Sequence, residues 1–213
     1  MSDSTLIPEE LRAFFNLGSI EVATTTSAPI GYGLNGGVAV SNVQPKLPAD
    51  YRLAIVGEAP NFADVKAKRP FAGSNGTLLT NILATHGMAI GCCFLGNCCQ
   101  YMPPDGMIFN FKHNWPEILN SEVSLKSDLQ TFKPNLVLLL GQYPLRRAAG
   151  QPVKIGDWRG TIFKCTDPDS PFYGFKCMAT YDPAKVLQLY NDWAPLFRFD
   201  INRAKHQAKD STL

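Results

Sequence analysis

The chain has 213 residues, of which 45% are apolar, and its formal net charge is +2 at pH 7. This length suits one domain of about 150–200 residues with short extensions. No apolar run approaches the roughly 20 residues that a membrane-spanning helix needs, so an α-helical membrane protein is excluded. The small positive charge permits nucleic-acid binding without predicting it.

The N-terminal sequence has no basic segment followed by an apolar stretch, so we expect a cytoplasmic protein without a secretion signal. The six cysteines are then expected to stay reduced.

Residues 1–50 differ in composition from the rest of the chain. A short helix is predicted over 8–15, and the Gly-, Pro-, Ser- and Thr-rich stretch after it is typical of a long loop or arm. Gly31, Gly33 and Gly36 match the spacing of dinucleotide-binding loops, but no strand pattern precedes them and no helix pattern follows. A flexible or substrate-covering loop is therefore favoured. We expect an arm over 1–50, one domain over 51–208 and a tail over 209–213.

From Tyr51 onward the apolar pattern becomes regular. Short apolar runs predict buried strands at 53–56, 92–95, 136–140 and 176–179. Apolar residues at helical spacing predict helices over 74–87, 120–134, 142–149 and 182–206, the last one interrupted near Pro195. Strands that alternate with helices predict an α/β fold with a parallel sheet covered on both faces.

One polar residue follows each predicted strand at its carboxyl end: Glu58, Asn97, Gln142 and Asp182. Ligands of open parallel sheets bind beyond the carboxyl ends of the strands. Each residue taken alone could be a helix cap or a solvated loop residue, but the four together predict a site on one rim of the sheet.

Five segments resemble, in order, the motifs of the uracil-DNA glycosylase superfamily, and most closely its iron–sulfur branch. They are "VGEAPN" (56–61), "RPFAGSNGTLLTNIL" (69–83), "FLGNCCQYMPPDG" (94–106), "FKPNLVLLLGQYPLRRAAG" (132–150) and "GDWRGTIF" (156–163). The resemblance runs from about Arg52 to about Ala208. It implies a three-layer α/β sandwich with a four-stranded parallel central sheet flanked by helices. It also implies an enzyme that flips a base out of DNA and hydrolyses the bond between base and sugar.

The resemblance assigns roles to residues of the predicted rim. Phe71 would stack on the flipped base, and Asn97 would bond the polar edge of that base, since an amide both donates and accepts. Glu58 would activate the attacking water and stabilise the cation-like sugar. The base-binding set is completed by Gly57, Ala59 and Pro60.

The resemblance also indicates residues that would contact DNA outside the base pocket. Lys185 would meet a phosphate, and Leu187 would wedge into the gap left by the flipped base, although packing within a helix is an equal alternative. Lys68, Arg69 and Ser74 would hold the backbone of the target strand. The expected partner is DNA and no membrane, and we expect a monomer that associates with the nucleoid.

The cysteines depart from the iron–sulfur branch. That branch needs a cysteine pair near the N-terminus, whereas the first cysteine here is Cys92. Tyr101 stands where the branch has another cysteine, and no cysteine lies near 122–124. We therefore expect no metal and no cofactor, and we interpret the cysteines as buried structural thiols.

The last motif departs as well, because "TYDPAK" places Asp182 and Ala184 where the family has the His and Ser of His-Pro-Ser. Asp182 is thus a third catalytic candidate beside Glu58 and Asn97. It could be protonated and donate a hydrogen bond, or be ionised and stabilise the sugar cation or activate water. It could also accept from an amino group, which would favour a different base.

The sequence accordingly predicts a monofunctional DNA glycosylase, because no lysine is clearly placed as an amine nucleophile. Its substrate would be uracil or a modified pyrimidine, including a modified cytosine of viral DNA. The alternative is a DNA-binding member of the same superfamily that has lost catalysis.

Overall fold

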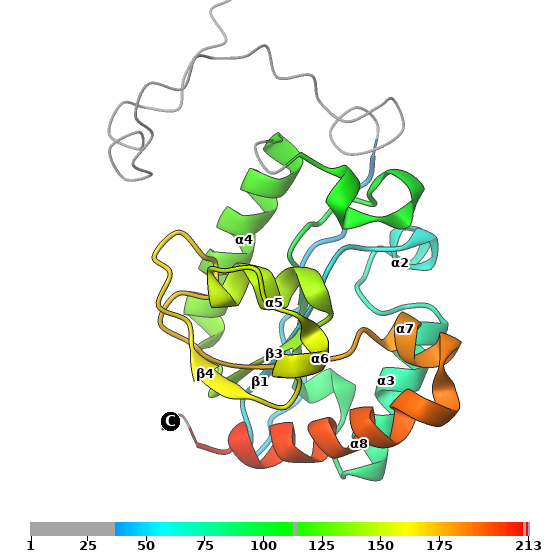
Figure 1. The fold of residues 1–213 in the computed structure, drawn as a ribbon, viewed down its shortest axis with the longest axis vertical. Helices are drawn as coiled ribbons and strands as arrows, with labels where there is room; N and C mark the ends of the chain where they lie inside the picture. The colour runs from blue at the N-terminus through cyan, green and yellow to red at the C-terminus, as the bar shows by residue number, and fades with distance from the viewer. Residues whose placement is uncertain (1–36, 113–114, 211, 213) are drawn as a thin grey trace, which may run out of the picture.

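The computed structural model describes residues 37–112, 115–210 and 212 (Figure 1). The helix predicted over 8–15 and the glycines at 31, 33 and 36 lie outside these residues. At the centre is a five-stranded sheet in the order β2-β1-β3-β5-β4. Its strands are β1 (Leu53–Gly57), β2 (Phe94–Asn97), β3 (Leu136–Leu140), β4 (Ile162–Lys164) and β5 (Lys176–Thr180).

The predicted α/β fold is confirmed, and the four predicted strands form a parallel sheet. The structure adds β4, a short edge strand that pairs antiparallel with β5. This strand has only three residues and none of them is buried, so it does not produce the apolar run that marked the other strands.

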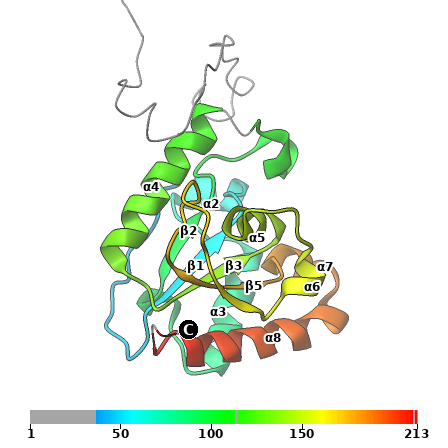
Figure 2. The same ribbon diagram turned by 60° about the vertical axis from the view of Figure 1, so that its left-hand side comes forward.

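Two pairs of helices cover the two faces of the sheet (Figures 1 and 2). One face carries α4 (Pro116–Phe132) and α5 (Gln142–Ala149), and the other carries α3 (Ser74–Thr85) and α8 (Tyr190–Gln207). Shorter helices are α2 (Phe62–Ala67), α6 (Ile155–Trp158) and α7 (Pro183–Gln188). In the part of the chain that the structure describes, no helix is long and apolar enough to cross a membrane.

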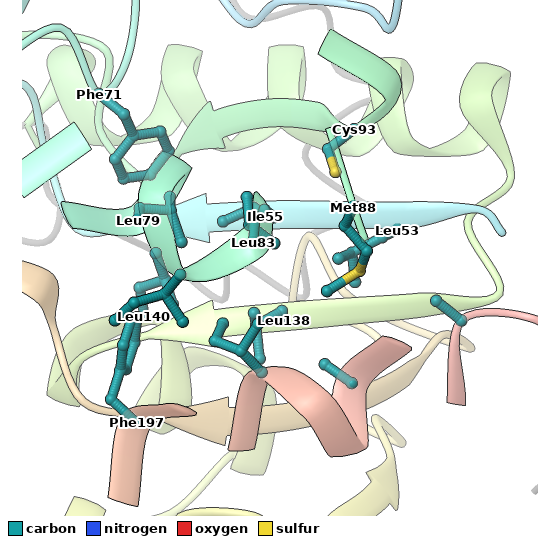
Figure 3. Close-up of a cluster of buried hydrophobic side chains, with 14 of the residues drawn as sticks. Leu53, Ile55, Phe71, Leu79, Leu83, Met88, Cys93, Leu138, Leu140 and Phe197 are labelled. Atoms are coloured by element: carbon teal, nitrogen blue, oxygen red, sulfur yellow. The ribbon is translucent and has the colours of Figure 1, made fainter. Parts of the chain in front are cut away.

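Alternation along the buried strands divides the core into two layers. In β1, Ala54 and Val56 pack into the layer under α4 and α5, whereas Leu53 and Ile55 pack into the layer under α3 and α8. Figure 3 shows the second layer, with Leu83 facing the strands and Phe71 at the end of the sheet where the strand arrows point. Because both faces of these strands are buried, successive residues along each strand are apolar.

Three predicted boundaries differ from the structure. The second strand begins at Phe94 rather than at Cys92, because residues 90–92 form a 3-10 turn. Helix α4 begins at Pro116 rather than near 120, since proline is well suited to the first turn of a helix. The break predicted at Pro195 lies instead at Leu189, and α8 continues through the proline. Pro195 lies in the second turn, where its ring removes a single helical hydrogen bond.

Residues 40–46 run along the outer edge of β2. Val43 forms an antiparallel bridge with Leu95, and the backbone N–H of Val40 donates to the carbonyl of Gln100 at 2.7 Å. This segment therefore pairs with an edge strand that would otherwise expose its backbone.

A buried ionic cluster fixes the carboxyl end of β5. Asp200 of α8 is fully buried and accepts from the Arg159 guanidinium at 2.8 and 3.1 Å, and from the Thr180 hydroxyl at 2.7 Å. Thr180 is the last residue of β5, so the cluster joins that strand end to α8 and to the loop before β4.

Asp200→Ala is expected to lower the free energy of unfolding by about 3 kcal/mol, because it leaves the buried Thr180 hydroxyl and the partly buried Arg159 guanidinium without their acceptor. Urea denaturation followed by circular dichroism measures this. The matched control is Asp50→Ala, which removes an exposed ion pair with Lys209 and should leave the midpoint unchanged. Equal effects of the two substitutions would contradict this role of the cluster.

Candidate active site

The sheet brings the predicted rim residues to one edge. Gly57 at the end of β1 is in register with Asn97 at the end of β2, and Leu140 is in register with Thr180. The residues that follow these strand ends therefore leave the sheet on the same side, where α2 and α7 also lie (Figure 1).

Glu58 is fixed against the first turn of α5. Its Oε1 accepts from the backbone N–H of Gln142 at 2.9 Å and from that of Tyr143 at 3.2 Å. These two N–H groups have no partner within the helix, and the helix dipole favours a carboxylate there. Among the described contacts none engages Oε2, so this second oxygen is available to a ligand.

Gly141 is required for this arrangement. A Cβ at this position would lie 2.5 Å from Oε1 of Glu58, and the φ of +102° is one that only glycine adopts readily. The glycine between β3 and α5 thus allows the carboxylate to reach the end of the helix.

The two carboxyl groups of the site influence each other. Burial raises the pKa of Glu58 above its ordinary value, the nearby Asp182 raises it further, and the N–H donors of α5 oppose both effects. Burial likewise raises the pKa of Asp182, against the backbone N–H groups of Ala184 and Lys185. Repulsion between two partly buried carboxyl groups favours a state in which one of them holds a proton.

Asp182 is the N-cap of α7. Its Oδ1 accepts from the backbone N–H of Ala184 at 2.6 Å, and Pro183 takes the first helical position. The carboxyl group is therefore held at the end of the loop that follows β5, close enough to Glu58 for their charges to interact.

Gly57, Phe71 and Asn97 form a cradle beside Glu58. A Cβ at Gly57 would lie 2.6 Å from Oδ1 of Asn97 and 3.1 Å from Cζ of Phe71. Asn97 is only 3% exposed, and its Nδ2 has no hydrogen-bond partner among the described residues. A buried amide without a partner is costly and marks a place where a ligand acceptor fits.

Phe71 is held in place by a contact that the sequence analysis missed. Its backbone has a φ of +54°, which is uncommon for a residue with a side chain. The buried Asp64 accepts from the N–H of Ala72 at 2.6 Å and from that of Asn61 at 3.0 Å. Asn61 and Asp64 also form a reciprocal capping box at the start of α2, and the spacing Asn-x-x-Asp was the available signal.

The side chain of Gln142 does not serve the rim. Its Nε2 donates to the carbonyl of Val153 at 2.6 Å and its Oε1 accepts from the N–H of Ile155 at 3.0 Å, so it fixes the loop after α5. Only its backbone N–H contributes to the site.

Ala59 and Pro60, which were predicted to bind the base, directly follow Glu58. Ala59 is half-buried and Pro60 is buried.

The predicted DNA contacts lie on the surface. Lys68 and Arg69 are exposed just after α2, and Ser74 is exposed as the first residue of α3. Lys185 and Leu187 are exposed on α7. Both groups flank the loops that carry Phe71 and Asp182.

The residues present do not fit an iron–sulfur cluster. Within 37–112 and 115–210, no group of three or more His, Cys, Asp or Glu side chains is placed to hold a metal ion. All six cysteines are free, and Cys99 Sγ lies 3.4 Å from the carbonyl of Tyr101. Burial raises the pKa of Cys98 well above its ordinary value, which favours the thiol over the thiolate that binds metals.

Comparison with known proteins supports the resemblance to the uracil-DNA glycosylase superfamily. Residues 44–204 match the sequence model of the Uracil DNA glycosylase superfamily. A type-4 uracil-DNA glycosylase of Pyrobaculum aerophilum is 32% identical over 140 residues, covering 64% of this chain and 68% of that protein. The type-4 uracil-DNA glycosylase of Thermotoga maritima is 27% identical over 158 residues, covering 73% of this chain and 77% of that protein. The chain belongs to the uracil-DNA glycosylase superfamily.

Proposed function

We propose that the protein is a monofunctional DNA N-glycosylase that extrudes uracil or a modified pyrimidine from DNA and hydrolyses its bond to the sugar. The observation that carries this proposal is the cradle of Gly57, Phe71 and Asn97, with a buried and unpartnered amide beside a fixed carboxylate. The names of its relatives support the same activity.

The cradle would bind the flipped base by two contacts. The buried ring of Phe71 would stack on the base, and the Nδ2 of Asn97 would donate to a carbonyl of the base. A base in this position would give the buried amide of Asn97 the acceptor that it lacks.

Glu58 would act on the sugar side of the bond. When the bond breaks, its electron pair leaves with the base and the sugar becomes cation-like. With Oε1 held by α5, Oε2 can orient a water molecule, stabilise the cation and accept the proton as the water attacks.

Asp182 would assist the leaving base. We infer that its neutral form donates to the base oxygen next to the sugar, because burial raises the pKa of Asp182 and thereby favours a proton on it. Uracil offers such an oxygen. If Asp182 is ionised instead, it accepts from an amino group, and the substrate would be a modified cytosine, including one of viral DNA.

DNA would lie along the rim, with Lys68, Arg69 and Ser74 on the phosphates of the target strand. Lys185 would hold a further phosphate and Leu187 would fill the gap left by the flipped base. We propose that the protein acts as a monomer in the cytoplasm, associated with the nucleoid.

A non-catalytic DNA-binding protein is the second candidate. It is favoured by the hydrogen bond from the N–H of Ala184 to Asp182, because helix capping alone would explain the carboxylate that replaces the family histidine.

A base-release assay distinguishes these functions. Oligonucleotides that each carry one uracil, hypoxanthine, 5-hydroxymethylcytosine or glucosylated 5-hydroxymethylcytosine are incubated with wild type and with Glu58→Gln. We expect release from at least one substrate and a loss of about 100-fold or more in the variant, since the amide cannot accept the proton. Asp157→Asn, on the exposed helix α6, is the control and should keep full activity. DNA binding without release of any base would support the non-catalytic candidate.

Gly141→Ala tests how Glu58 is positioned. Its Cβ would enter the space of Oε1, so we expect a large fall in kcat with little change in DNA affinity. The control Gly174→Ala has a similar positive φ of +83° but no atom within 4 Å of its Cβ, so it introduces backbone strain without the clash. Equal activities of the two variants would contradict the role of the capped carboxylate.

The pH profile tests the protonation states. Glu58 must lose its proton, so the rate is expected to fall as pH decreases through its raised pKa. Asp182 must keep its proton, so the rate is expected to fall as pH rises through its raised pKa. Asp182→Asn, which donates without titrating, should lose the alkaline fall. A wild-type rate that rises to a plateau at alkaline pH would show that ionised Asp182 is the active form.

A further inference from the structure

Two large aromatic side chains are exposed beside the candidate active site. Phe62, the first residue of α2, is 73% exposed, and Phe109 is 55% exposed. Phe62 lies four residues after Glu58, where the loop that leaves β1 enters α2. The ring of Phe109 packs edge-on against Tyr143 with 5.6 Å between centroids, and Tyr143 donates its backbone N–H to Glu58. Phe109 is thus linked to Glu58 through Tyr143, and Phe62 begins the helix that follows Glu58 in the chain.

Local contacts of the turn that carries Phe109 keep its ring exposed. Its neighbours Ile108 and Phe111 are buried in the core, and Asn110 Nδ2 donates to the carbonyl of Pro104 at 3.1 Å. Buried anchors on both sides thus hold the Phe109 ring outward. In Figures 1 and 2 the turns at 104–110 lie next to α2, which carries Phe62.

Basic side chains accompany both rings. The Arg146 guanidinium lies over the ring of Phe109, 5.6 Å from its centroid. Lys66 is exposed one helical turn after Phe62, and Lys68 and Arg69 follow. Exposed aromatic faces with neighbouring cations are typical of surfaces that bind single-stranded nucleic acid, where bases stack on the rings and phosphates meet the charges.

We propose that Phe62 and Phe109 are stacking platforms for unpaired bases next to the extruded nucleotide, so that the protein acts on single-stranded DNA. This inference rests on the proposed function in taking DNA as the partner. In a duplex the flanking bases stack on each other and are paired, so they are not available to these rings. In a single strand every base offers a face, whatever its identity.

Fluorescence anisotropy with a labelled single-stranded oligonucleotide of the four ordinary bases tests the platforms at one fixed salt concentration. Phe62→Ala and Phe109→Ala are each expected to weaken binding by about 5-fold or more, whereas binding to the duplex of the same sequence stays unchanged. The matched control is Phe199→Ala on α8, whose side chain is 64% exposed, and it should bind as wild type does. Thermal melting checks that each variant is folded.

Phe109→Trp provides a readout specific to stacking. We expect this variant to retain the affinity of wild type and its added fluorescence to be quenched when the single strand binds. Wild-type affinity of both alanine variants, or an equal loss of single-strand and duplex binding, would overturn the proposal. Because the oligonucleotide carries no target base, the result does not depend on base release. If the variants without these phenylalanines still release a base from both single-stranded and double-stranded DNA, the proposed function stands and the stacking platforms are ruled out.

Discussion

The contact between Glu58 and the first turn of α5 is the constraint on which the site depends. It joins the end of β1 to the turn after β3, and it is possible only because residue 141 is a glycine. The contact satisfies two N–H groups of the helix and also fixes one carboxylate oxygen, which leaves the other to face a ligand. The side chain that caps the helix is thus also the one that we propose to act in catalysis.

The rest of the rim is arranged around that carboxylate by the parallel sheet. Gly57 keeps the end of β1 free of a side chain, so that Phe71 and Asn97 can approach each other over it. Asp64 holds the loop of Phe71, while the ion pair of Arg159 and the buried Asp200 holds the end of β5. The site thus combines a rigid support with one unsatisfied amide, the kind of local departure from full hydrogen bonding that is typical of binding sites.

Much of the fold could be predicted from the sequence because buried parallel strands leave continuous apolar runs, as at 136–140. The convergence of Glu58, Asn97 and Asp182 followed from the same geometry, since parallel strands end on one edge. The role of Gln142 could not be predicted, because its partners Val153 and Ile155 come near only after the chain folds. Short or irregular elements such as β4 and the 3-10 turn before β2 could not be predicted either, because so few residues leave no periodic pattern in the sequence.

The most direct test of the cradle is the side-chain amide signal of Asn97 in an NMR titration with free uracil. If the base enters as proposed, the amide protons of Asn97 should move downfield as Nδ2 gains an acceptor. Gly57→Ala, whose Cβ fills the cradle, should abolish the shift. An Asn97 signal that does not move while uracil binds would contradict the account, because the base would then occupy another place.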